Sequence, residues 1–310
     1  MTGMLIFKNI CRMKRINSLM ACVTALAALA SCERSEVAPQ EPENGYRYTF
    51  SIVDDNTKAT LDNEGVAWEA NDRVGMFVDT YKGYANVDVT TTPKSIVLYS
   101  PSAIPAGAMA YGYYPYNNTN TNAEMTLINL SNVQQGGTNS AMPMAGVPFE
   151  VETDVPTVTE NGKTKAETNG QIQFLNLGAI IDFKIYSADY SDETVKYVTF
   201  KAENAVVAGD AYLDITAVSA TDESTLELVW MGGENEYDEV KVNQEVAVAA
   251  TKDDATSIYM VVAPGTYSGT ITIGTDVATY TFNYTNKELG RNKLKHYNMN
   301  LSSSNANRVE

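Results

Sequence analysis

The sequence predicts an all-β fold made of two β-sandwich domains in tandem, and three observations support this prediction. Short alternating runs rich in Thr, Val, Tyr and Ile extend from residue 46 to residue 301. Gly, Pro and Asn interrupt these runs at about the 8–12-residue spacing that is typical of sandwiches. No segment after residue 45 shows a sustained helical apolar period, so we expect strands throughout.

The length and two polar stretches predict the division into domains. The 310 residues are enough for about two domains, at roughly 100–200 residues each. Residues 32–45 are polar and contain two prolines, which predicts a flexible tether. A second polar, turn-rich stretch predicts a connector at residues 151–170. We therefore expect an N-terminal sandwich at residues 46–150 and a C-terminal sandwich at residues 171–310.

The first predicted strand spans residues 46–52 and alternates strictly. Tyr46, Tyr48, Phe50 and Ile52 share one parity, with polar residues between them. Since successive side chains of a strand point to opposite faces, these four side chains are expected on the buried face.

The remaining runs give further expectations. Trp68 and Trp230 are predicted to be core residues, one in each domain. A strand is expected at residues 225–230, and the final residues 302–310 are expected to be a polar tail.

The N-terminus has the pattern of an export signal. Residues 1–20 carry four basic side chains and no acidic one, and an apolar run follows at residues 20–30. This run is about half of the ~20 residues that a membrane-spanning helix needs, so a cleaved signal peptide at residues 1–31 is predicted. Its end, Leu29-Ala30-Ser31-Cys32, resembles the lipobox of bacterial lipoproteins. That resemblance implies acylation of Cys32; the alternative is an ordinary secretory signal cut near a cysteine.

The charge and the residue counts exclude several classes of function. There are 22 Lys and Arg against 38 Asp and Glu, and removal of residues 1–31 leaves 18 basic residues, a net charge of −20. Such a charge repels the phosphate backbone, so no nucleic-acid partner is expected. His296 is the single histidine and no cysteine follows Cys32. A zinc site and a Ser–His–Asp triad are therefore not expected, and we predict a protein that is not an enzyme and has no cofactor or metal.

Three groups of residues have both a structural and a functional interpretation. The acidic run at residues 234–239 has carboxylates that calcium could use, but a charged hairpin tip is favoured. The tyrosines of residues 111–116 suit packing in a sandwich better than a platform for sugars. His296 is expected to be a solvated strand histidine.

Several segments resemble the fimbrillin family of Bacteroidales, which includes the subunits, anchors and tips of lipoprotein-derived pili. In the N-terminal half these are residues 46–53, residues 57–60 and the segment Trp68-Glu69-Ala70-Asn71-Asp72-Arg73-Val74-Gly75-Met76-Phe77. A tyrosine–proline patch at residues 110–116 and an apolar run at residues 174–181, which resembles the first strand of the C-terminal half, also fit. The closing pattern is Gly290-Arg291-Asn292-Lys293, followed by residues 297–301. Together with the lipobox, these segments span the chain.

This resemblance implies a fold, a location and partners. The fold would be two transthyretin-like (Greek-key) β-sandwiches after a lipoprotein signal peptide. The protein would lie at the outer membrane and cell surface, in the fimbrium, held by the lipid on Cys32. Its partners would be other pilin subunits, identical or paralogous, and a host or bacterial surface ligand.

The resemblance also implies proteolytic processing. In stalk subunits of this family, a trypsin-like protease cuts the loop after the first strand. The equivalent bond here is Lys58–Ala59, where the best-known members have Arg before the cut. The cut would free the strand of Tyr46, Tyr48, Phe50 and Ile52.

Losing that strand would leave unpaired backbone groups and an apolar slot, which a strand of a neighbouring subunit would fill. The candidate donor is the last predicted strand, residues 293–301, through Tyr297, Met299 and Leu301. The alternative is that this strand pairs within its own domain.

Two other functions compete with a structural or adhesive pilus subunit. A glycan-binding surface lipoprotein of a polysaccharide-utilisation system would need an exposed, coplanar aromatic pair, for instance among residues 111–116. A glycoside hydrolase would need two facing carboxylates about 5–10 Å apart, and no local pattern marks such a pair.

Overall fold

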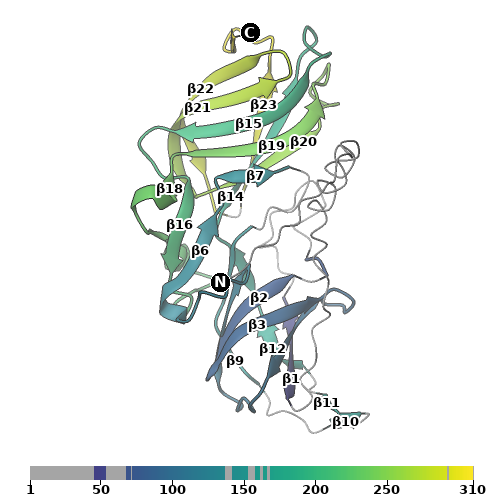
Figure 1. Cartoon of the computed structure of the whole chain (residues 1–310), viewed down its shortest axis with the longest axis vertical. Helices are drawn as coiled ribbons and strands as arrows, with labels where there is room; N and C mark the ends of the chain where they lie inside the picture. The colour runs from purple at the N-terminus through teal and green to yellow at the C-terminus, as the bar shows by residue number, and fades with distance from the viewer. Residues whose placement is uncertain are drawn as a thin grey trace, which may run out of the picture. The chain divides into compact units, whose positions relative to one another are not determined.

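A computed structural model describes residues 45–53, 68–70, 72–136, 142–152, 158–160, 163–165, 168–291 and 293–309 (Figure 1). All of them belong to one compact unit, Glu41–Glu310. Within these ranges the secondary structure consists of strands and three short 3-10 helices, without an α-helix. The prediction of an all-β fold is therefore confirmed. The described residues form no helix long and apolar enough to cross a membrane.

The first sheet begins and ends on neighbouring segments of the chain. It follows the order β12-β1-β4-β3-β2-β5-β8-β13, and β9 also pairs with β5. Although β12 and β13 are at opposite ends of this order, only Gln173 separates them in the sequence. The strands are β1 (Tyr46–Ile52), β2 (Arg73–Val78), β3 (Tyr81–Asp88), β4 (Ser95–Ser100), β5 (Met109–Tyr114), β8 (Met144–Gly146), β9 (Phe149–Glu150), β12 (Thr168–Ile172) and β13 (Phe174–Asn176).

The second half of the chain is a sandwich of a three-stranded and a six-stranded sheet. The small sheet consists of β20 (Ser257–Val262), β14 (Ala179–Tyr186) and β23 (Leu294–Asn300), in that order. The large sheet consists of β24 (Asn307–Val309), β22 (Thr279–Leu289), β21 (Gly265–Thr275), β15 (Thr194–Ala202), β19 (Glu239–Ala247) and β7 (Val133–Gln135), in that order. Figure 1 shows β15, β21 and β22 side by side. Alternate side chains of both sheets, such as Phe183 and Phe200, fill one apolar core.

A small sheet around β16 joins segments that are far apart in the sequence. β16 (Ala208–Leu213) pairs with β6 (Thr126–Leu130), with β17 (Val229–Trp230) and with β18 (Glu236–Tyr237). The remaining elements are the hairpin of β10 (Val158–Glu160) and β11 (Lys163–Lys165), and the 3-10 helices η1 (Ala123–Met125), η2 (Glu223–Leu226) and η3 (Gly233–Asn235).

The strand pairing crosses both predicted domain boundaries. β6 and β7 lie in the first half of the sequence, yet they pair with β16 and β19 of the second half. Conversely, β12 and β13 pair with β1 and β8, so the run at residues 174–176 belongs to the first sheet rather than to the C-terminal sandwich. An alternating pattern predicts that a strand forms, but not which distant strand it pairs with. The connector expected at residues 151–170 is described only in part, and the division into two domains there stays a prediction.

Two other expectations are corrected in detail. Trp68 is buried in the first core, whereas Trp230 is only partly buried against the second. The strand expected at residues 225–230 is reduced to β17, because η2 occupies its beginning. Asp222 initiates η2: its carboxylate accepts the Ser224 N–H at 3.0 Å, as a helix N-cap does.

A close contact between Gly75 and Tyr113 gives a prediction about the first sheet. The two residues are register partners in β2 and β5, and a Cβ added at Gly75 would lie 2.0 Å from Tyr113 Cζ. The ring cannot retreat, since it is buried and its hydroxyl donates to Asn117 O at 2.8 Å. Gly75→Ala is expected to lower the free energy of unfolding by about 1–3 kcal/mol, as measured by urea denaturation.

Gly290→Ala is the matched control for this substitution. Its added Cβ would approach only the flexible Lys293 side chain, with Cδ at 2.8 Å, so the change should stay within about 0.5 kcal/mol. Equal effects of the two substitutions would contradict the close packing of Tyr113 on Gly75.

Candidate strand-exchange site

The residues predicted for lipidation and cleavage, Cys32, Lys58 and Ala59, lie outside the described residues. The two candidate exchange strands, in contrast, are described. Their positions show which contacts break when β1 is removed and when β23 is released.

β1 is an inner strand of the first sheet. On one side it pairs antiparallel with β4 over six residue pairs, from Tyr46↔Ser100 to Ser51↔Ser95. On the other side it pairs parallel with β12, with an irregularity between Thr49 and Ser51. At that irregularity the Asn169 side chain accepts the Thr49 N–H at 3.1 Å. Removing β1 would thus expose backbone groups on both neighbours.

Three of the four predicted anchor residues of β1 are buried. Tyr48, Phe50 and Ile52 lie in the first apolar core, whereas Tyr46, at the beginning of the strand, is 37% exposed. The ring of Phe50 packs edge-on against Phe149, with the centroids 5.1 Å apart. Each buried side chain of this size stabilises the fold by roughly 1.5–3 kcal/mol. The strand is therefore part of the interior of this sheet.

The Tyr48 hydroxyl adds a polar contact inside this core. It donates to Ile104 O at 3.2 Å and accepts the Ile104 N–H. A buried donor and acceptor are thus satisfied by a single side chain of β1. A strand that replaces β1 must supply hydrogen bonds to the Ile104 carbonyl oxygen and N–H, or these buried groups lose their partner.

The candidate donor strand pairs within its own half of the chain. β23 runs parallel to β14, from Ile180↔Leu294 to Tyr186↔Asn300, and is an edge strand of the three-stranded sheet. Met299 and Leu301 are buried in the core of this half, and Tyr297 is partly buried against it. Its anchors are therefore occupied in the single chain, and its outer edge is unpaired among the described strands.

A histidine–carboxylate contact ties β23 to β14. The His296 Nδ1 atom lies 2.8 Å from Asp182 Oδ2. The Asp182 side chain is fully buried, whereas that of His296 is 52% exposed. Among the described residues, the other carboxylate oxygen of Asp182 has no hydrogen-bond partner. The sequence predicted a solvated strand histidine and gave no sign of this buried partner, because the two residues are 114 positions apart.

His296→Ala is expected to lower the free energy of unfolding by about 1–3 kcal/mol, because it leaves a buried carboxylate without a donor. Thermal or urea denaturation of the variant measures this loss. Lys295→Ala, on the same strand at an exposed position, is the matched control and should have an effect within about 0.5 kcal/mol. Combining His296→Ala with Asp182→Asn should recover part of the loss; additive losses would contradict the contact.

The tyrosines of residues 111–116, for which packing was favoured over a sugar platform, are turned inward. Tyr113 is buried and Tyr111, Tyr114 and Tyr116 are only partly exposed. The Tyr114 hydroxyl donates to Asp72 Oδ1 at 2.9 Å, and its ring packs edge-on against Trp68. Burial and the neighbouring Asp72 carboxylate raise the pKa of Tyr114 well above its usual range. The cluster packs the segments at residues 68–77 and 110–116 against each other rather than forming an exposed coplanar pair.

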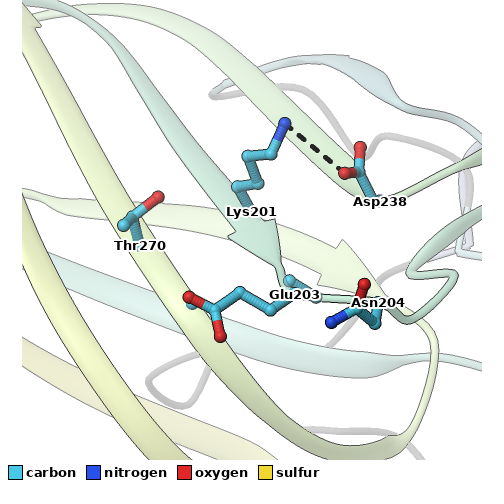
Figure 2. Close-up of a pocket in the computed structure, with 7 residues that line it drawn as sticks. Lys201, Glu203, Asn204, Asp238 and Thr270 are labelled. Atoms are coloured by element: carbon cyan, nitrogen blue, oxygen red, sulfur yellow. Dashed lines mark ion pairs between the residues drawn. The ribbon is translucent and has the colours of Figure 1, made fainter.

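A pocket lies at the end of β15 (Figure 2). Its volume is about 290 Å³, and Lys201 Nζ lies 3.4 Å from Asp238 Oδ2 at its rim. Asp238 belongs to the acidic run, which forms η3, β18 and the beginning of β19. No group of three or more His, Cys, Asp or Glu side chains that could hold a metal occurs among the described residues. The residues that line the pocket are Lys201, Ala202, Glu203, Asn204, Asp238, Gly269 and Thr270.

No protein-family model matches this sequence, and no curated protein matches it. Solved structures do match. A candidate cell adhesion protein from Bacteroides ovatus has a TM-score of 0.53 at 14% identity, over 86% of this chain and 95% of that one. Another, from Bacteroides uniformis, has a TM-score of 0.50 at 12% identity, over 85% of this chain and 95% of that one.

The tip fimbrial protein Mfa3 from Porphyromonas gingivalis, with a C-terminal truncation, also matches. The match covers 86% of this chain and 98% of that one, with a TM-score of 0.41 at 9% identity. The two closer structures establish the fold. This chain has the all-β fold of candidate cell adhesion proteins of Bacteroides, and the predicted resemblance to the fimbrillins is confirmed at the level of the fold.

Proposed function

We propose that this protein is a structural or adhesive pilus subunit, or an accessory protein of a pilus, of the fimbrillin kind. The observation that carries the proposal is the position of β1, which is paired on both sides and has Tyr48, Phe50 and Ile52 in the core. A sheet that depends on such a strand becomes a receptor for another strand once that strand is removed. The fold shared with the Bacteroides candidate cell adhesion proteins supports the proposal.

The route to the cell surface is part of the proposal. The signal peptide at residues 1–31 is removed, Cys32 is acylated, and the lipid holds the protein at the outer membrane until assembly. More than one acyl chain gives firm anchoring, since a single chain binds a membrane only marginally. A surface protease then cuts Lys58–Ala59 and releases β1.

The strand that takes the place of β1 comes from a second subunit, identical or paralogous. The segment with Tyr297, Met299 and Leu301 has the same spacing of anchors as Tyr48, Phe50 and Ile52. One aromatic and two aliphatic or thioether side chains at alternate positions can fill three adjacent places of the core. In the single chain these anchors are held by β14 and the core behind it, so donation requires the release of β23.

Trypsin treatment of the full chain tests the assembly. We expect cleavage at Lys58–Ala59 and polymers on size-exclusion chromatography and electron microscopy. Lys58→Gln is the matched control, which should stay monomeric under the same treatment. A wild-type chain that remains intact at Lys58, or is cut there and stays monomeric, would overturn the stalk role.

N-terminal sequencing of protein extracted from the cell surface tests the export route. A blocked N-terminus with a lipid on Cys32 is expected for the immature form, and a free Ala59 for the assembled form. A free N-terminus at any other residue before 46 would contradict lipidation.

A further inference from the structure

The C-terminal segment ends in a strand that the sequence did not predict. Residues 302–310 were expected to be a polar tail, but β24 pairs antiparallel with β22 at the edge of the large sheet. Its register joins Tyr280 to Arg308, with one pair on either side. The pairing involves three residues, and Val309 is 59% exposed. Backbone pairing of this length stabilises weakly, so a side chain must hold the strand.

Arg308 is that side chain. Its Nε donates to the Tyr280 hydroxyl at 3.0 Å, and its Nη2 lies 3.4 Å from Glu193 Oε1. The guanidinium carbon lies 4.9 Å from the centroid of the Tyr190 ring and 5.8 Å from that of Tyr280. One carboxylate and two aromatic rings therefore surround the cation.

Glu193 is a buried acceptor of hydrogen bonds. Its side chain is 3% exposed, and it accepts hydrogen bonds from Thr275 Oγ1 at 2.6 Å and from the Tyr280 hydroxyl at 2.8 Å. Burial raises the pKa of Tyr280 to about 12, which keeps this hydroxyl neutral and able to donate. Among the described residues, Arg308 is the cation that pairs with Glu193. Removing the cation from a buried carboxylate destabilises a fold strongly, so Glu193 requires a positive partner.

The residues that surround Arg308 all lie in or next to the central strands of the large sheet. Tyr190 and Glu193 precede β15, Thr275 ends β21 and Tyr280 lies in β22. These side chains contact the arginine, and the edge of β22 pairs with the backbone of the short extended segment that carries it. We infer that Glu193, Tyr190 and Tyr280 form an arginine-binding site, filled within the chain by Arg308, that also accepts the terminal segment of a second copy of this chain.

The second copy is the partner because its residues 307–309 reproduce the observed register and contacts without any new surface. Competition within the chain controls this binding. A tethered segment has an effective concentration on the order of millimolar, so a separate segment binds well only when the chain's own Arg308 is lost or displaced. This inference concerns an edge far in the sequence from β1 and holds whether or not β1 is exchanged.

The test uses the full-length chain and a fluorescent peptide of residues 302–310. We expect saturable binding of the peptide to the Arg308→Ala chain and at least tenfold weaker binding to the wild-type chain. A peptide with alanine in place of Arg308 should bind the Arg308→Ala chain at least tenfold more weakly. Adding Glu193→Gln to the Arg308→Ala chain should reduce the binding of the unchanged peptide to the same extent.

Hydrogen exchange provides the second measurement. The amides of β22 at residues 279–281 and of β24 should exchange at least tenfold faster in Arg308→Ala than in the wild-type chain, with an intermediate rate in Arg308→Lys. Asn307→Ala, an exposed neighbour on the same strand, is the matched control and should leave the rate unchanged. Unchanged exchange in Arg308→Ala, absence of peptide binding, or binding that does not depend on the arginine of the peptide would each overturn the inference.

Discussion

Replacing Phe50 with alanine is expected to lower the free energy of unfolding by about 3–5 kcal/mol, the usual range for a buried aromatic ring. The Phe50 side chain is fully buried, and its ring packs against Phe149 at a centroid distance of 5.1 Å. Because β1 is paired on both sides, the cavity cannot be closed by moving an edge strand. Urea denaturation followed by circular dichroism measures the loss.

Tyr46→Ala is the matched control, since Tyr46 shares the strand and the parity of Phe50 but is exposed. It should change stability by less than about 1 kcal/mol. If both substitutions had the same small effect, β1 would be peripheral, and the proposal that its removal opens a receptor groove would fail.

Phe200→Ala is expected to have an effect of the same size, about 3–5 kcal/mol, in the core of the other half. The Phe200 ring is fully buried, stacks on Tyr284 at 4.8 Å and meets Tyr267 edge-on at 6.1 Å. We also expect a single unfolding transition in both phenylalanine variants. β6 and β7 of the first half pair with strands of the second, so neither half can unfold without exposing strands of the other.

Differential scanning calorimetry of the wild-type chain and of the two variants tests this coupling. Lys201→Ala, next to Phe200 on the opposite face of β15, is the matched control and should shift the transition little. Two separate transitions, with Phe50→Ala moving one and Phe200→Ala the other, would contradict the coupling and would favour independent domains.

The local pattern predicts single strands well where both the alternation and the burial are strong. The parity of Tyr48, Phe50 and Ile52 predicted their buried face, because a period of two leaves one arrangement for an amphipathic strand. Tyr46 departs from it because it lies at the end of the strand, where the core ends. The strand expected at residues 225–230 is shortened to β17, because the capping carboxylate of Asp222 favours η2 at its beginning. Apolar periodicity does not detect such a local hydrogen bond.

The partners of the strands were beyond prediction from one sequence. Gln134 illustrates why: its side-chain amide donates to Val261 O at 2.7 Å and accepts the Val261 N–H at 2.9 Å, across 127 positions. Nothing near Gln134 in the sequence distinguishes it from any other polar strand residue. The Glu193–Arg308 pair was missed for the same reason, since an acidic residue and a terminal arginine become a site only when β22 brings them together.

The inner position of β1 has a consequence for the direction of any assembly. β1 lies between β4 and β12, and these two strands run in opposite senses relative to it. Withdrawing β1 would open one gap bounded by β4 and β12, which constrain an incoming strand differently: it must run opposite to β4 and along β12. An incoming strand that pairs with both β4 and β12 has only one orientation. A polymer of such molecules would therefore have two different ends, a head and a tail.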